Sequence, residues 1–329
     1  MVSDVACRAD SLIQAVSDTS ALPSARRSGW WRGRTAVIGI PYLWLVAFFL
    51  LPFLIVLKIS FSEMELVTFK DLLTVHEGVL QLALKYSNYV FLTQDDLYFA
   101  TFVSSVKYAG LTTLLCLLIG YPFAYFMARA RATVQPALLM LVMLPFWTSF
   151  LLRVYAWKGL LGEGGWISEL LITLHVDELL LSAGLIPALG KFMNTPFSLN
   201  LGMVYSYLPF MVLPLYANLS KMDLRLLEAA ADLGATPWVG FWRITVPLSK
   251  AGIIAGSMLV FIPCVGEYVI PELLGGPQTL MIGRVLWDEF FSNNDWPMAA
   301  TVAIAMVLLI LVPLALFNRY QDAAREASR

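Results

Sequence analysis

The stretch that decides the fold reads Glu228-Ala-Ala-Ala-Asp-Leu-Gly234 and, further on, Ile244-Thr-Val-Pro247. It is a polar island between two strongly apolar segments, a pattern typical of a short folded element that lies outside a membrane between two spans. Four apolar residues at helical spacing predict one apolar stripe: Leu226, Leu227, Ala230 and Leu233. Gly234 follows directly, where a helix C-cap needs positive φ, so the pattern predicts a helix that ends in a tight turn.

A second short helix is predicted immediately after this turn. Thr236 and Pro237 suit an N-cap and a first helical position, and Asp223 suits the N-cap of the helix before. The second helix is expected over 238–244 and should end before Pro247, because proline cannot continue a helix interior. The whole element is therefore predicted to be two short helices hinged at a glycine.

Composition places most of the chain in a membrane. Of 329 residues, 59% are hydrophobic and 14% are charged, whereas roughly 25% are charged in an average soluble protein. A helix that crosses a bilayer needs about 20 apolar residues, and four uncharged runs are long enough: 36–57, 109–128, 199–220 and 297–318. Two shorter runs, 136–152 and 251–266, extend through a charged residue to Trp157 and Leu274. The sequence therefore predicts an all-α membrane protein with six transmembrane helices.

The basic residues predict the orientation of these spans. With the N-terminus inside, most of the Lys and Arg residues fall on the cytoplasmic side and most acids fall outside. This orientation predicts a mobile cytoplasmic tail over 1–34, a permease-like six-span domain over 35–318 with a cytoplasmic loop at 221–250, and a cytoplasmic tail over 319–329. A seventh span over 167–190 would place that loop outside, so this interrupted apolar segment is expected to lie along the outer face as an amphipathic helix.

No catalytic, nucleotide or metal site is visible in the sequence. The nearest approach to a phosphate-binding loop, 184–191, has the wrong spacing, and Phe192 stands where Ser or Thr should bind Mg²⁺. The three cysteines are scattered and predict neither a disulfide nor a metal site. The basic residues are explained by topology and imply no nucleic-acid partner. The chain is therefore expected to be neither an enzyme nor the holder of a cofactor.

The hinged element also carries a family resemblance. The pattern E-A-A, three residues, G, nine residues, I-x-[LV]-P is similar to the cytoplasmic EAA loop in membrane subunits of ABC importers. It is matched here at Glu228, Ala229, Ala230, Gly234, Ile244, Val246 and Pro247. In that family the loop forms a coupling helix seated in a groove of the ATPase subunit. The resemblance implies a type I ABC importer permease fold in a bacterial inner membrane. The implied partners are a second homologous permease, an ATPase dimer that binds ATP and Mg²⁺, and a periplasmic binding protein.

Three further stretches resemble the spermidine/putrescine type of permease. They are LPFWTSFLLRVYAW at 144–157, YLPFMVLPLY at 207–216 and VGEYVIPELLGG at 265–276. The resemblance covers roughly residues 35–320 and is closest to the first permease subunit of putrescine importers. It implies a polyamine substrate, putrescine above all. A permease for another solute (an opine, an anion or iron) and a non-transport membrane scaffold are the alternatives.

Glu267 is the main candidate for contact with a cationic substrate. A carboxylate within a span is costly and usually faces the bundle interior or an aqueous path. Pro263 and Pro271 are expected on the same face of the fifth helix, where they loosen the backbone around the acid. One more acid and three aromatic residues could attract an organic cation: Glu272, Tyr268, Trp147 and Trp157. The alternative role for Glu267 is a structural ion pair with Arg153, and for the aromatic residues it is packing. Three tyrosines are expected to make core or helix contacts rather than to bind substrate: Tyr205, Tyr207 and Tyr216.

Overall fold

The structure is a computed structural model that describes residues 28–62, 64–65, 68–69, 73–76, 79–82 and 86–326. Residues 1–27 of the predicted N-terminal tail and the last three residues of the predicted C-terminal tail lie outside the described residues. The chain divides into two compact units, Met1–Val56 and Leu57–Arg329.

The described part of the first unit is helical throughout. Helix α2 (Ser28–Leu45) continues through a π-helical turn, η2 (Val46–Leu50), into α3 (Leu51–Ser60). The stretch Val37–Ser60 is long and apolar enough to cross a bilayer. Because α2 begins at Ser28, the predicted boundary of the tail at residue 34 falls within a helix.

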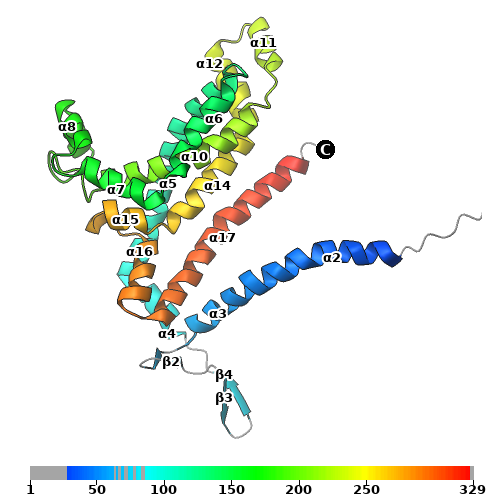
Figure 1. Ribbon diagram of the computed structural model, residues 1–329, viewed down its shortest axis with the longest axis vertical. Coiled ribbons are helices and arrows are strands. Elements are labelled where there is room, and N and C mark those ends of the chain that lie inside the picture. Colours follow the sequence, from blue (N-terminus) through cyan, green and yellow to red (C-terminus); the bar gives the residue numbers. More distant parts are fainter. Residues whose placement is uncertain are drawn as a thin grey trace, which may run out of the picture. The chain divides into compact units, whose positions relative to one another are not determined.

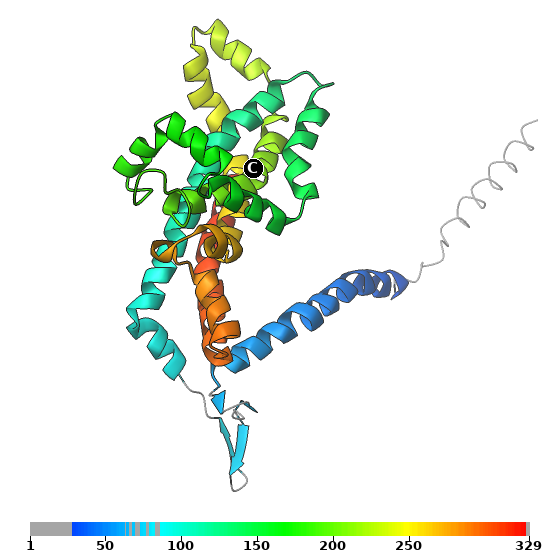
Figure 2. The ribbon, with the colours of Figure 1, turned by 60° about the vertical axis from the view of Figure 1, so that its left-hand side comes forward.

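Three long helices form the core of the second unit (Figures 1 and 2). Helices α5 (Asp96–Arg129), α10 (Pro196–Leu219) and α14 (Lys250–Val265) pack against one another, and α17 (Trp296–Glu326) packs against α14. A Cβ atom at Gly256 would lie 2.8 Å from Met211 Sδ. Glycine is therefore required for this close approach, as is common between membrane helices, which gain stability chiefly from van der Waals packing.

Within the described residues, four helices are long and apolar enough to span a membrane, namely Val37–Ser60, Asp96–Arg129, Pro196–Leu219 and Trp296–Ala315. Two bent helix pairs pass the same test. They are Gln135–Trp147 with Phe150–Leu161, bent by 87°, and Pro237–Leu248 with Lys250–Val265, bent by 64°. With each pair counted as one span, the total is six. The predicted all-α membrane fold is confirmed, but two of its spans are not single straight helices.

The third predicted span breaks at Thr148. Helix α6 (Gln135–Met143) and the 3₁₀ turn η3 (Leu144–Trp147) precede the break, and α7 (Phe150–Leu161) follows it. Thr148 is extended, with ψ of 150°, and its backbone N–H and its Oγ1 both donate to the Pro145 carbonyl, at 3.3 and 2.9 Å. The Pro145 carbonyl therefore accepts from Thr148, three residues on, and not from the residue four positions on as in an α-helix. The helix ends here and the chain bends.

The segment 167–190 forms two short helices where one was predicted. They are α8 (Trp166–Thr173) and α9 (Val176–Ser182), and His175 between them has a φ of 55°. The longer of the two has eight residues, a length of about 12 Å, so neither helix can cross a bilayer alone.

The segment before α4 (Ser87–Gln94) contains strands that the sequence analysis did not predict. β1 (Met64–Glu65) pairs with β2 (Thr68–Phe69), and β3 (Leu73–His76) pairs with β4 (Val79–Leu82), both antiparallel. The longer hairpin contains Thr74, Val75 and Val79, whose branched side chains suit a strand.

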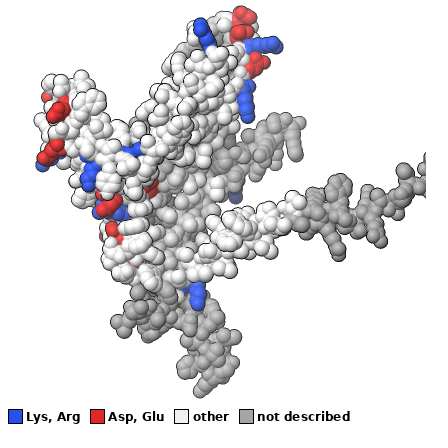
Figure 3. All heavy atoms as spheres, in the orientation of Figure 1, with Lys and Arg blue, Asp and Glu red and all other residues white. Residues whose placement is uncertain are grey.

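The second unit is polar at its ends. Helices α11 (Arg225–Asp232) and α12 (Pro237–Gly240) lie at one end of its long axis, and α4 and α16 (Ile282–Trp287) lie toward the other (Figure 1). Charged side chains gather around α11 and around α8, and few lie on the surface between (Figure 3). An uncharged belt of this kind is what a bilayer requires of the surface that faces it.

Candidate functional site

The hinged element forms as predicted at its turn. Helix α11 ends before Gly234, whose φ is 83°, and the Thr236 side chain accepts a hydrogen bond from the Val239 N–H at 3.4 Å at the start of α12. Asp223 Oδ1 accepts from the Arg225 N–H at 3.0 Å. The N-cap position is therefore Leu224 and not Asp223, because the helix begins one residue later than predicted, but the Asp223 side chain still satisfies a first-turn N–H.

The second helix does not end before Pro247, contrary to the sequence prediction. After α12 the chain forms a π-helical turn, η4 (Phe241–Thr245), and then α13 (Val246–Leu248). The Val246 N–H donates to the Phe241 carbonyl, five residues back. Pro247 therefore falls in the first turn of α13, where its missing N–H leaves no bond unmade. We call residues 225–248 the hinge hairpin.

Aromatic contacts tie the hinge hairpin to α5. The Phe241 ring meets the Tyr121 and Tyr125 rings edge-on, with centroids 5.6 and 5.9 Å apart. Tyr121 Oη and Ser249 Oγ share a hydrogen bond of 2.8 Å. Edge-to-face ring pairs and buried hydroxyl bonds fix orientation, so these contacts attach the hairpin to a core helix.

The predicted stripe of α11 is largely uncovered by this chain. Leu233 is 90% exposed and Leu226 is 47% exposed, while Leu227 and Ala230 are half-buried. Among the other motif residues, Glu228, Ala229 and Pro247 are exposed and Ile244 is half-buried. The hairpin thus presents an exposed surface of leucine, alanine and a carboxylate.

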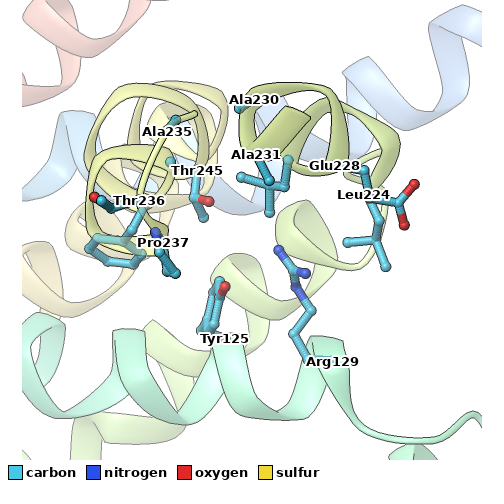
Figure 4. Close-up of a pocket in the computed structure, with 13 residues that line it drawn as sticks. Tyr125, Arg129, Leu224, Glu228, Ala230, Ala231, Ala235, Thr236, Pro237 and Thr245 are labelled. Atoms are coloured by element: carbon cyan, nitrogen blue, oxygen red, sulfur yellow. The ribbon is translucent and has the colours of Figure 1, made fainter. Parts of the chain in front are cut away.

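A hollow of about 360 Å³ separates the hinge hairpin from α5 (Figure 4). Tyr125 and Arg129 of α5 form one wall, and the small residues Ala230, Ala231 and Ala235 lie opposite. The hairpin therefore touches α5 through its aromatic contacts and is separated from α5 by the hollow elsewhere.

Glu267 lies at a break in the fifth predicted span. Helix α14 ends at Val265, and α15 (Val269–Leu274) begins after Tyr268. Glu267 Oε1 accepts from the Val269 N–H at 3.0 Å, which caps α15. The prediction that Pro263, Glu267 and Pro271 share one helical face was therefore wrong, because the glutamate side chain replaces the helical bonds at the break.

Two other elements meet at this break. Tyr207 of α10, a buried residue, donates its hydroxyl to Glu267 Oε2 at 2.5 Å. A Cβ atom at Gly283 of α16 would lie 2.7 Å from the Glu267 carbonyl oxygen. Since backbone cannot give way as a side chain can, glycine at this position lets α16 pack directly on the break. The half-buried carboxylate is therefore bonded by α10 and α15, while α16 packs on the backbone of the break.

The alternative ion pair between Glu267 and Arg153 is not formed. Arg153 Nε and Nη1 are buried and have no hydrogen-bond partner within the described part of the chain. The guanidinium lies 5.7 Å from the ring centroids of Phe146 and Phe150 instead. Arg153 thus rests on aromatic faces of its own bent helix pair.

The remaining candidates divide into two groups. Tyr268 stacks on Trp287 of α16, with ring centroids 4.5 Å apart and the rings 7° from parallel. Glu272 Oε2 forms an ion pair with Arg284 Nε, also on α16, at 2.7 Å. The Arg284 Nε–H is not aligned for a hydrogen bond. Both therefore join Glu267 at the junction of α15 and α16. Trp147 is 70% exposed on η3, and Trp157 packs edge-on against Tyr205 at 5.3 Å, so these two lie on the bent α6–α7 pair.

Sequence reasoning missed three residues of this region: Tyr207, Arg284 and Trp287. Tyr207 was expected to make core or helix contacts, but its bond to Glu267 was not predicted. A buried tyrosine hydroxyl normally finds a partner, and this requirement was the signal available for it. Arg284 and Trp287 gave no such signal, because their roles depend on α16 folding back onto α15.

Comparison with known proteins decides the family. Residues 117–325 match the family described as "Binding-protein-dependent transport system inner membrane component". The chain belongs to this family. It is therefore a multi-pass inner-membrane permease, a transport component rather than an enzyme, and a subunit that works with an ATPase and a binding protein. Permeases of this family carry no cofactor of their own.

Named relatives of the permease carry polyamine descriptions. It is 37% identical over 282 residues to the spermidine/putrescine transport system permease protein PotB of Haemophilus influenzae, covering 86% of this chain and 92% of that protein. It is 39% identical over 273 residues to PotB of Escherichia coli, covering 82% and 92%. The permease is thus of the spermidine/putrescine type by similarity.

Solved structures support the fold of the permease. It superimposes with a TM-score of 0.60 on a chain of a bacterial ABC transporter that imports the acidic polysaccharide alginate, at 17% identity, over 89% of this chain and 98% of that one. A second structure, the alginate transporter in complex with a pentasaccharide-bound periplasmic protein, gives the same TM-score over 91% and 96%. At this identity the likeness concerns the fold alone.

Proposed function

We propose that this permease forms half of the translocation pathway of an ATP-driven polyamine importer, with putrescine as its main substrate. The observation that carries the proposal is the half-buried Glu267 carboxylate at the α14–α15 break. A carboxylate offers about four lone-pair sites, and Tyr207 and the Val269 N–H use one on each oxygen. The remaining sites can accept an ammonium group that has lost part of its water.

The surroundings of Glu267 suit a cation that passes without being held. Tyr268 follows Glu267 in the sequence, and its ring stacks on that of Trp287 at the end of α16. Aromatic faces attract organic cations by about 0.5–2 kcal/mol. Glu272 already has Arg284 as a partner, so a second ammonium group would reach it only by displacing a guanidinium. The names of the PotB relatives support a polyamine substrate. The carboxylate at the break also favours a cation, because it would repel an anion.

The hinge hairpin is the proposed contact with the ATPase dimer. Its exposed Leu226, Leu233 and Glu228 offer the apolar and charged groups that an interface needs, and its aromatic contacts with α5 transmit movement to the core. ATP binding would draw the two ATPase subunits together, and the hairpin would turn the cavity outward through differential contacts in the two states. A second homologous permease supplies the other half, and a periplasmic binding protein delivers the polyamine.

Uptake by the reconstituted importer tests the substrate. With the permease pair, ATPase and binding protein in proteoliposomes, labelled putrescine should accumulate only with ATP. Unlabelled putrescine and spermidine should compete with it, because both present ammonium groups to Glu267. An opine, an inorganic anion and a ferric chelate serve as control competitors. Uptake of one of these in place of putrescine would contradict the proposal.

Cysteine labelling tests the proposed orientation, in which the N-terminus and the hinge hairpin are cytoplasmic. Leu233 is 90% exposed and suits a cysteine on the hinge hairpin, whereas Gly240 of the same hairpin is buried. Asn293 is exposed near the opposite end of the second unit and suits the other cysteine. In a background with Cys7 replaced by Ser, Asn293→Cys should react with a membrane-impermeant maleimide in intact spheroplasts. Leu233→Cys should react only after the inner face is opened. The reverse pattern would contradict the positive-inside argument.

A further inference from the structure

The hollow beneath the hinge hairpin is lined by two polar groups that have no hydrogen-bond or ion-pair partner among the described residues. Thr245 is fully buried, lines the hollow, and its Oγ1 has no hydrogen-bond partner among the described residues. The Arg129 guanidinium projects into the same space from α5 (Figure 4), and no described carboxylate lies within ion-pair distance of it. A buried hydroxyl without a partner is unfavourable, so these two groups together indicate a ligand with acceptor oxygens.

The Arg129 side of the hollow offers donors to an anion. Arg129 is held in place by the Tyr125 ring, with its Cζ 4.8 Å from the ring centroid. Glu228 is the carboxylate that lines the same hollow, and it lies at the rim, apart from the guanidinium (Figure 4). A planar guanidinium with free donors matches phosphate oxygens in pairs.

An apolar groove adjoins the hollow along α5. It measures about 280 Å³ and its lining includes Leu118, Pro122, Trp242 and Ile253. Phe241 lines both spaces. Leu118 is 61% exposed and Trp242 is 52% exposed, so the groove opens onto the surface of a helix that spans the membrane.

We propose that the hollow and the groove together bind one anionic phospholipid, with its phosphate on Arg129 and Thr245 and an acyl chain along the groove. A single amphiphile explains a hollow with a guanidinium and a hydroxyl in its lining next to a mainly apolar groove, with Phe241 lining both. The exposed Trp238 and Trp242 beside it are residues that favour the level of lipid headgroups. A bound lipid would sit between α5 and the hinge hairpin, where it would stiffen the connection between them. Lipid binding at this site does not depend on which solute the permease transports.

Native mass spectrometry of the purified importer complex tests the site. The complex is titrated with phosphatidylglycerol and, separately, with phosphatidylcholine of the same acyl chains. Wild type should retain phosphatidylglycerol about tenfold more tightly, because phosphatidylcholine has the same phosphate but also a quaternary ammonium group, which the Arg129 guanidinium repels. Arg129→Gln should abolish this preference, and Thr245→Val should weaken it severalfold with its shape preserved. Arg131→Gln is the matched control, since Arg131 is an exposed cation outside the lining of both cavities.

Three results would overturn the proposal. Equal retention of the two lipids by wild type would remove the anionic preference, and equal losses in Arg129→Gln and Arg131→Gln would reduce it to general surface charge. Displacement of phosphatidylglycerol by inorganic phosphate alone would mean that the apolar groove plays no part. If Arg129→Gln instead leaves lipid retention unchanged and releases the ATPase, an acidic side chain of the ATPase occupies the hollow and the lipid does not.

Discussion

Glu267→Gln should lower polyamine uptake by at least tenfold while the complex still assembles. The substitution keeps the size of the side chain and its bond from the Val269 N–H, and removes the charge that an ammonium group would meet. Loss of one unit charge at 4 Å is worth up to about 4 kcal/mol at an effective dielectric constant near 20, and hydration of the path reduces this figure. Since about 1.4 kcal/mol is tenfold, a tenfold loss is a conservative expectation. Uptake rates are compared with the yield of assembled complex.

Companion variants separate a substrate role from a structural one. Tyr207→Phe removes the other hydrogen bond to Glu267 but leaves the carboxylate, so it should give a smaller loss. Tyr268→Ala and Trp147→Ala should also be milder, because cation–π contacts are weaker and shared. Arg153→Gln should not resemble Glu267→Gln, since Arg153 does not pair with Glu267 in this structure. Wild-type uptake by an assembled Glu267→Gln complex would remove Glu267 from the path.

Gly234→Val should leave the permease in the membrane and uncouple it from ATP hydrolysis. Nothing lies within 4 Å of a Cβ atom at Gly234, so the effect comes from the backbone alone. A β-branched residue at φ of 83° carries strain of about 1–3 kcal/mol, which would change the angle between α11 and α12. Uptake is measured beside co-purification of the ATPase, and both should fall severely.

Matched controls make the coupling result specific. Gly234→Asn tolerates positive φ and should retain most activity. Glu228→Lys reverses an exposed charge on α11 and should also uncouple, whereas Glu228→Gln should do so less. Normal uptake from both Gly234→Val and Glu228→Lys would contradict the docking role of the hinge hairpin.

The sequence by itself determined the features that depend on local chemistry. Runs of apolar residues predicted six membrane-crossing segments because each helix must satisfy its own backbone in lipid. Gly234 and Thr236 predicted the turn and the second helix start, because positive φ and N-capping depend on single residue types. The turn and the second helix start form as predicted, the described residues contain four to six candidate spans, and the motif around the turn pointed to the correct family.

Tertiary structure alone decided how the candidate site is assembled. Tyr207 and Glu267 are 60 residues apart in sequence, and their bond exists because α10 packs against the break after α14. Arg284 pairs with Glu272, and Trp287 stacks on Tyr268, because α16 folds back on α15. The break at Glu267 was hidden from the sequence because a side chain there replaces helical backbone bonds. Helix periodicity predicts which residues are apolar on one face, but partners across helices depend on how the helices pack.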